Sequence, residues 1–74
     1  MFPRLTVYLD KYATNDFTII VKLKRDRSAK WVNVARADAE NVTAARKVWR
    51  ALGEVYADIY NVEAEYVHGG GGAV

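Results

Sequence analysis

The stretch FTIIVKLK, residues 17–24, decides the fold of this chain of 74 residues. Its odd-numbered positions are all large and apolar, whereas its even-numbered positions end in two lysines. A period of two is typical of a β-strand with one buried face. We therefore predict a strand over residues 17–25 whose odd-numbered side chains face the core.

Both neighbouring stretches continue this pattern. Residues 4–12 alternate in the same way and end at the turn-forming sequence ATND, residues 13–16, which predicts a hairpin. On the other side, the charged turn RDRSAK at residues 25–30 leads into residues 31–36, where Val32 and Val34 share one face. These three runs predict a three-stranded antiparallel meander.

A helix follows the meander. Asp38 is placed as its N-cap with Glu40 in the first turn, and apolar residues then recur at steps of three and four as far as Ile59. This pattern predicts one helix over residues 39–60, with Trp49 and Leu52 in the core and Trp31 exposed on the sheet. Gly53 allows a break, although the apolar pattern resumes on the same face.

The end of the chain has two interpretations. Residues 61–67 alternate like a short fourth strand, which we favour, but a helix continued to Val67 would also place Ile59, Val62 and Tyr66 on one stripe. The predicted fold is therefore α+β: a three-stranded antiparallel meander packed on one long C-terminal helix, with a short fourth strand, in one domain of residues 1–67. Residues 68–74 are predicted to be a flexible, glycine-rich tail.

Composition argues against an enzyme. A chain this short leaves little room for an enclosed active site, and it contains no cysteine for a thiol nucleophile or a zinc-thiolate site. His68 lies beside the glycine tail with nothing to orient it, and the pair Glu63 and Glu65 has no further metal ligands nearby. We therefore expect no catalysis, metal, cofactor or small-molecule substrate.

The same composition gives an expectation for the protein's location. The chain has no apolar run long enough for a membrane span and no signal-peptide core, which predicts a cytoplasmic protein without membrane contact. The absence of Gln and Cys, with a single Met, is a composition seen in thermophilic proteins.

Charge is concentrated in one part of the chain. Residues 22–36 hold six of the eleven basic residues and one of the nine acidic ones. If the odd-numbered positions of the first two strands face the helix together with Val32 and Val34 of the third, cations and aromatic rings share the opposite face. Nucleic-acid-binding proteins use such an arrangement for phosphates and bases. The predicted nucleic-acid contacts, with duplex DNA as the preferred partner, are Arg4, Tyr8, Lys22, Lys24, Arg25, Arg27, Lys30, Trp31 and Asn33. The alternative is a solvated face on which Trp31 covers aliphatic stems.

The helix carries two further features. Arg46, Lys47 and Arg50 form a basic group that is either a phosphate clamp or a solvated surface with an Arg50–Glu54 pair. The apolar arc is broader than a small sheet covers, which predicts a homodimer. Its predicted interface residues are Val48, Val55, Tyr56, Tyr60 and Val62. The alternative function is accordingly a self-associating module with no nucleic-acid role.

The order of three strands and a helix over residues 4–60 is similar to the DNA-binding modules of tyrosine recombinase arm domains and of plant AP2-type factors. This resemblance concerns the order of elements and includes no diagnostic motif. It implies a sheet laid in the major groove of DNA.

Overall fold

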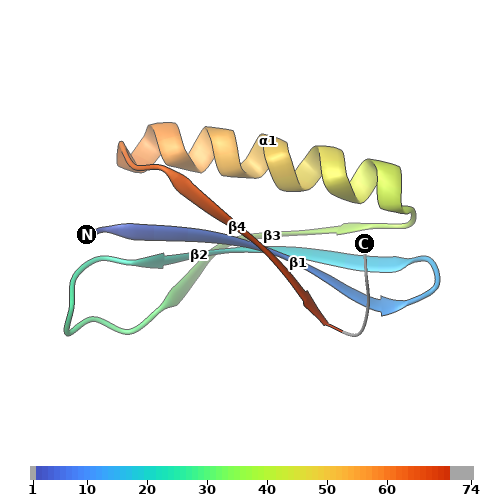
Figure 1. The fold of residues 1–74 in the computed structure, drawn as a ribbon, viewed down its shortest axis with the longest axis horizontal. Coiled ribbons are helices and arrows are strands. Elements are labelled where there is room, and N and C mark those ends of the chain that lie inside the picture. Colours follow the sequence, from blue (N-terminus) through green and yellow to red (C-terminus); the bar gives the residue numbers. More distant parts are fainter. Residues whose placement is uncertain (1, 71–74) are drawn as a thin grey trace.

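The computed structural model describes residues 2–70, which form one sheet with one helix across it. Strands β1 (Arg4–Ala13), β2 (Asp16–Lys24) and β3 (Val32–Ala39) precede helix α1 (Val42–Tyr60) and strand β4 (Ala64–Gly70). The sheet order is β3-β2-β1-β4, with β4 parallel to β1 and the other pairs antiparallel (Figure 1). The predicted meander, helix and short fourth strand are confirmed.

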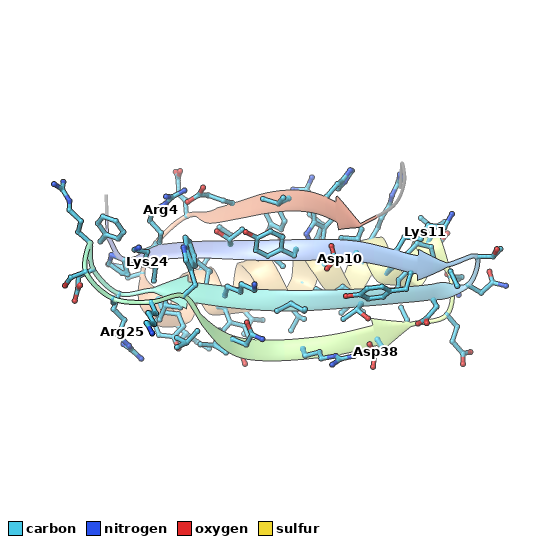
Figure 2. All side chains as sticks on the ribbon, turned by 90° about the horizontal axis from the view of Figure 1, so that it is seen from below. Arg4, Asp10, Lys11, Lys24, Arg25 and Asp38 are labelled. Atoms are coloured by element: carbon cyan, nitrogen blue, oxygen red, sulfur yellow. The ribbon has the colours of Figure 1, made fainter. Side chains whose placement is uncertain are left out.

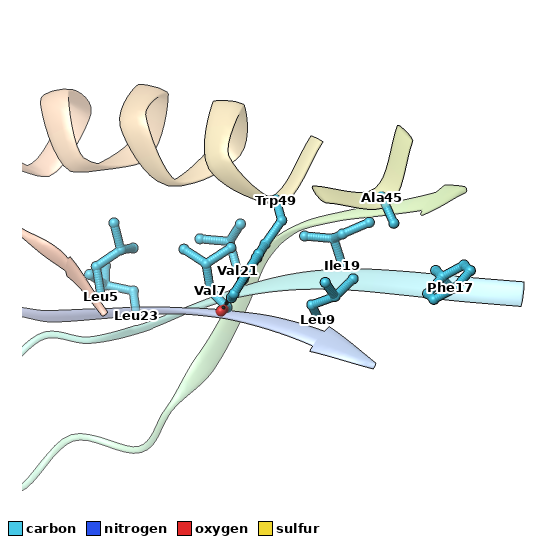
Figure 3. Close-up of a cluster of buried hydrophobic side chains, with 9 residues drawn as sticks. All are labelled: Leu5, Val7, Leu9, Phe17, Ile19, Val21, Leu23, Ala45 and Trp49. Atoms are coloured by element: carbon cyan, nitrogen blue, oxygen red, sulfur yellow. Dashed lines mark hydrogen bonds between the residues drawn. The ribbon is translucent and has the colours of Figure 1, made fainter. Parts of the chain in front are cut away.

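The core lies between α1 and one face of the sheet. Seven apolar strand residues that face the helix are buried: Leu5, Val7 and Leu9 of β1 and Phe17, Ile19, Val21 and Leu23 of β2. Ala45 and Trp49 of α1 pack on them (Figure 3). Trp49 is 6% exposed and its indole Nε1–H donates a hydrogen bond of 2.7 Å to the backbone oxygen of Val7. Trp31 is 37% exposed, so the predicted difference between the two tryptophans is confirmed.

The junction between β3 and α1 differs from the prediction. Asp38 is not the N-cap, because residues 37–39 pair with β2 and the Asp38 carboxylate accepts a hydrogen bond from the Thr18 hydroxyl. The helix begins four residues later in the chain than that position, at Val42. Asn41 is its N-cap, and Asn41 Oδ1 accepts a hydrogen bond of 2.8 Å from the Ala44 backbone N–H.

Strand β3 contains one irregularity, and the residues before it keep the faces that the sequence predicted. Val21 pairs with Ala35 whereas Lys22 pairs with Asn33, so Val34 is an extra residue in the ladder. Both Val34 and Ala35 pack against the core as a result. Asn33 stays on the same face as Lys22, as predicted.

The helix ends at Asn61, whose φ of 55° is the left-handed conformation expected there. Strand β4 then begins three residues later than predicted and includes Gly69 and Gly70, which pair with Asp10 and Lys11 of β1. The remaining part of the predicted tail, residues 71–74, lies outside the described residues.

Gly53 allows α1 to approach β4 closely. It is buried, and a methyl group added at its Cα would lie 2.6 Å from Cε1 of the Tyr66 ring. That ring is held edge-on against Trp49, with ring centroids 5.3 Å apart, so it has little freedom to move aside. Glycine at this position therefore serves packing and does not break the helix.

No helix in residues 2–70 is long and apolar enough to cross a membrane.

Candidate nucleic-acid interface

The face of the sheet opposite α1, here called the outer face, is not covered by any other described element. Strand register assigns twelve residues to it in addition to Arg4 and Trp31. They are Thr6, Tyr8 and Asp10 of β1, Thr18, Ile20, Lys22 and Lys24 of β2, Asn33, Arg36 and Asp38 of β3, and Glu65 and Val67 of β4.

The charges of the outer face differ between its two ends. Arg4, Lys24 and Arg25 lie at the end near the β2–β3 turn, whereas Asp10 and Asp38 lie toward the other end (Figure 2). Arg36 shares that other end, where its Nη2 lies 3.5 Å from Asp38 Oδ1. The sequence predicted a basic face, but its lysines without a carboxylate partner among the described residues gather at one end. We call the part formed by Arg4, Lys22, Lys24, Trp31 and Asn33 the basic half.

Arg4 differs from the other predicted contact residues because it is already paired. Its Nη2 lies 2.8 Å from Glu65 Oε1, and its Nε donates to Glu65 Oε2 at 3.0 Å. The hydrogen bond raises the pKa of the Arg4 guanidinium and holds the pKa of the Glu65 carboxyl below its usual range. A phosphate would have to compete with Glu65 for this arginine.

Aromatic rings lie beneath the cations of the basic half. Lys22 Nζ is 5.2 Å from the centre of the Tyr8 ring, and the Arg4 guanidinium is 5.6 Å from that of Trp31. Lys24 Nζ lies 6.0 Å from the ring of Phe2, a residue that the sequence did not single out. These cation–π contacts hold the ammonium groups of Lys22 and Lys24 over the face, where neither forms an ion pair with a carboxylate of residues 2–70.

The β2–β3 turn, residues 25–30, is ordered by Asp26. One carboxylate oxygen, Asp26 Oδ1, accepts hydrogen bonds of 2.9 Å from the Ser28 N–H, the Ser28 hydroxyl and the Ala29 N–H. These bonds, led by that from the Ser28 hydroxyl, hold the pKa of Asp26 below its usual range. The turn extends away from the helix, on the side of the outer face (Figure 1).

The basic side chains of this turn are exposed. Arg25, Arg27 and Lys30 form no ion pair with any described residue. Arg25 lies 5.9 Å from the centre of the Tyr60 ring, which ties one side of the turn to the end of α1. Arg25, Arg27 and Lys30 thus lie in the turn that directly follows Lys24, the last residue of β2.

The predicted dimer residues do not form one surface. Val48 and Val55 lie on one side of α1, and Val55 is 53% exposed. Tyr56 and Tyr60 are half-buried and stack on each other with centroids 6.4 Å apart. Val62 follows the helix and lines a hollow with Gly53 and Tyr66, on the β4 side.

The basic group on α1 is also divided. The Arg50 guanidinium lies 4.4 Å from the centre of the Tyr66 ring, and among the described residues it has no ion pair with Glu54. Arg46 and Lys47 are exposed. His68 contacts the Trp49 ring at 4.8 Å, and residues 2–70 contain no group of three or more His, Cys, Asp or Glu side chains suited to a metal ion.

Comparison of the chain with protein-family models, curated proteins and solved structures finds no match.

Proposed function

We propose that this protein binds nucleic acid, with duplex DNA as the preferred form, through the basic half of the outer face and the β2–β3 turn. One observation carries the proposal. Lys22 and Lys24 at the end of β2, and Arg25, Arg27 and Lys30 in the turn that follows it, have no carboxylate partner among the described residues. Such a cluster attracts polyanions, and phosphate contacts supply most of the sequence-independent affinity for DNA.

The shape of this region favours a duplex. Strands β2 and β3 are antiparallel neighbours, and the basic turn that joins them projects beyond the last paired residues of the sheet (Figure 1). The major groove of B-DNA, which is about 12 Å wide, admits a two-stranded projection of this kind. In that position the turn would meet phosphates, while Asn33 and Trp31 would lie within reach of base edges and sugars. On the other half of the face Arg36 is paired with Asp38 and Asp10 is an anion, so that half would attract the backbone less.

We propose further that the protein is a binding protein without catalytic activity and that it acts in the cytoplasm as a homodimer. Exposed apolar side chains on one side of α1, including Val55 and Ile59, support the dimer. The small size of the chain supports a binding role, because it leaves little room for an enclosed active site.

Replacement of Arg25 and Arg27 by Ala tests the nucleic-acid proposal. The double variant should bind every duplex sequence more weakly, and the slope of log K against log salt should become shallower by about one to two units. Lys11→Ala with Arg46→Ala removes the same charge elsewhere and serves as the matched control. Gel shifts on duplex and single-stranded oligonucleotides at two salt concentrations measure both quantities.

The second candidate function is a self-associating module with no nucleic-acid role. The exposed Val32, Val55 and Ile59 favour it. Two results would identify this second function. The Arg25/Arg27 variant and its control would bind duplex DNA with equal affinity, and salt would not weaken self-association.

A further inference from the structure

One side of α1 presents an apolar stripe that the sheet covers only in part: two of its residues, Val48 and Leu52, pack partly against the core. Val48, Leu52, Val55 and Ile59, here called the α1 flank, follow one another at steps of four, three and four. Val55 is 53% exposed and Ile59 is 61% exposed. Gly53 and Arg50, on the other side of the helix, contact Tyr66 of β4. The α1 flank therefore lies on the side of the helix away from β4, which is the β3 side of the sheet.

The charges of α1 oppose its own dipole. Its first turn contains no acidic residue and its last turn no basic one. Arg46, Lys47 and Arg50 occupy its first half, whereas Glu54 and Asp58 occupy its second half. Arg46 with Arg50, and Glu54 with Asp58, are also like-charge neighbours four residues apart. Both arrangements destabilise a solitary helix.

An antiparallel partner helix would turn the same charges into attractions. Lys47 directly precedes Val48 and Asp58 directly precedes Ile59, so both lie on the same border of the α1 flank. Neither forms an ion pair with another described residue. In an antiparallel pair of identical helices, the basic half of each copy meets the acidic half of the other.

We propose that two copies of this chain associate through antiparallel packing of their α1 flanks. With the two-fold axis between Gly53 and Glu54, Val48 meets Ile59 of the second copy, and Leu52 meets Val55 of the second copy. Lys47 then lies two residues, about 3 Å along the helix axis, from the position directly opposite Asp58 of the second copy, and its long side chain spans that offset. The symmetry repeats this ion pair. Apolar and charged patterns are thus compatible with one arrangement, which favours a second copy as the occupant of the flank.

This geometry sets the direction of the outer faces. The α1 flank lies on the side of the helix, not on its top, so the two-fold axis that pairs the helices runs roughly along the normal to the sheet. Such an axis leaves both sheets on the same side of the helix pair. If the basic half binds DNA as proposed above, the dimer presents two basic halves to one duplex. The second contact then raises the affinity of the dimer for that duplex through effective concentration.

Complementary charge reversal tests the pairing. Lys47→Glu alone and Asp58→Lys alone each convert two attractions into two repulsions, so each should weaken homodimerisation about tenfold at about 50 mM salt. A mixture of the two variants should form a one-to-one heterodimer, because both of its ion pairs are again attractive. Native mass spectrometry of copies with different mass labels measures all three species.

Matched controls separate this pairing from changes in net charge. Arg46→Glu and Glu63→Lys make the same charge changes away from the α1 flank and should leave dimerisation unchanged. Val55→Asp and Ile59→Asp should give folded monomers, since both side chains are exposed in one copy. Wild-type protein that remains monomeric at hundreds of micromolar, or a mixture without heterodimer enrichment, would overturn the proposal.

The duplex measurements keep the two proposals distinct. Val55→Asp should lower duplex affinity about a hundredfold through lost avidity while the Arg25/Arg27 effect persists in the monomer. A dimer that binds no nucleic acid removes the proposed function and leaves the helix pairing. A dimer whose disruption leaves duplex affinity unchanged contradicts the same-side arrangement.

Discussion

Single residues in the β2–β3 turn decide how its cations are presented. Asp26 is an acidic residue among Lys24, Arg25 and Arg27, and simple electrostatics would count it against phosphate binding. Its three hydrogen bonds give it a different role, because they hold the turn in one conformation. Order in the free protein reduces the conformational entropy lost when the turn binds.

Replacement of Asp26 by Ala separates these two effects. The variant gains positive charge at the turn, yet we expect it to bind duplex DNA about threefold to tenfold more weakly, because the turn loses its order. Glu63→Ala removes an exposed acid at the same end of the molecule without touching the turn. It should bind equally well or slightly better. A gain in affinity for Asp26→Ala measured by fluorescence anisotropy would show that charge, not order, controls the turn.

Among the strands and the helix, the sequence predicted the features that depend on residues close together in the chain. The period of two in β1 and β2 identified the buried odd-numbered positions, and the helical period identified Trp49 as a core residue. The helix start was misplaced because Asp38 and Asn41 are both good N-cap residues. Pairing of residues 37–39 with β2 decides between them, and that contact is not local in sequence.

Gly53 provides a test of element packing. Helix propensity alone predicts that Gly53→Ala stabilises the protein by about 1 kcal/mol. Contact of the added methyl with the Tyr66 ring reverses the sign, and we expect destabilisation of about 1–3 kcal/mol. Urea denaturation followed by circular dichroism measures the difference. In a Tyr66→Ala background the same substitution should become neutral or stabilising, and destabilisation there would argue against the ring contact as the cause.

At the scale of the whole molecule, the sequence predicted the cations of the candidate site but not their neighbours. Lys22, Lys24 and the turn could be assigned to one region because a single hairpin contains them. The Arg4–Glu65 pair joins residues 61 positions apart and depends on the parallel docking of β4 beside β1. The Arg36–Asp38 ion pair at the other end of the outer face likewise required the register of β3, which extends three residues beyond the predicted strand.

Contact of nucleic acid with the basic half and the β2–β3 turn can be tested residue by residue. The measurement is a titration of ¹⁵N-labelled protein with a short duplex, followed by amide chemical shifts. The largest shifts should fall in residues 22–33, with little change at Asp10, Asp38 or the exposed surface of α1. Shifts centred on Arg46 and Lys47, or no shifts at low salt, would contradict this contact.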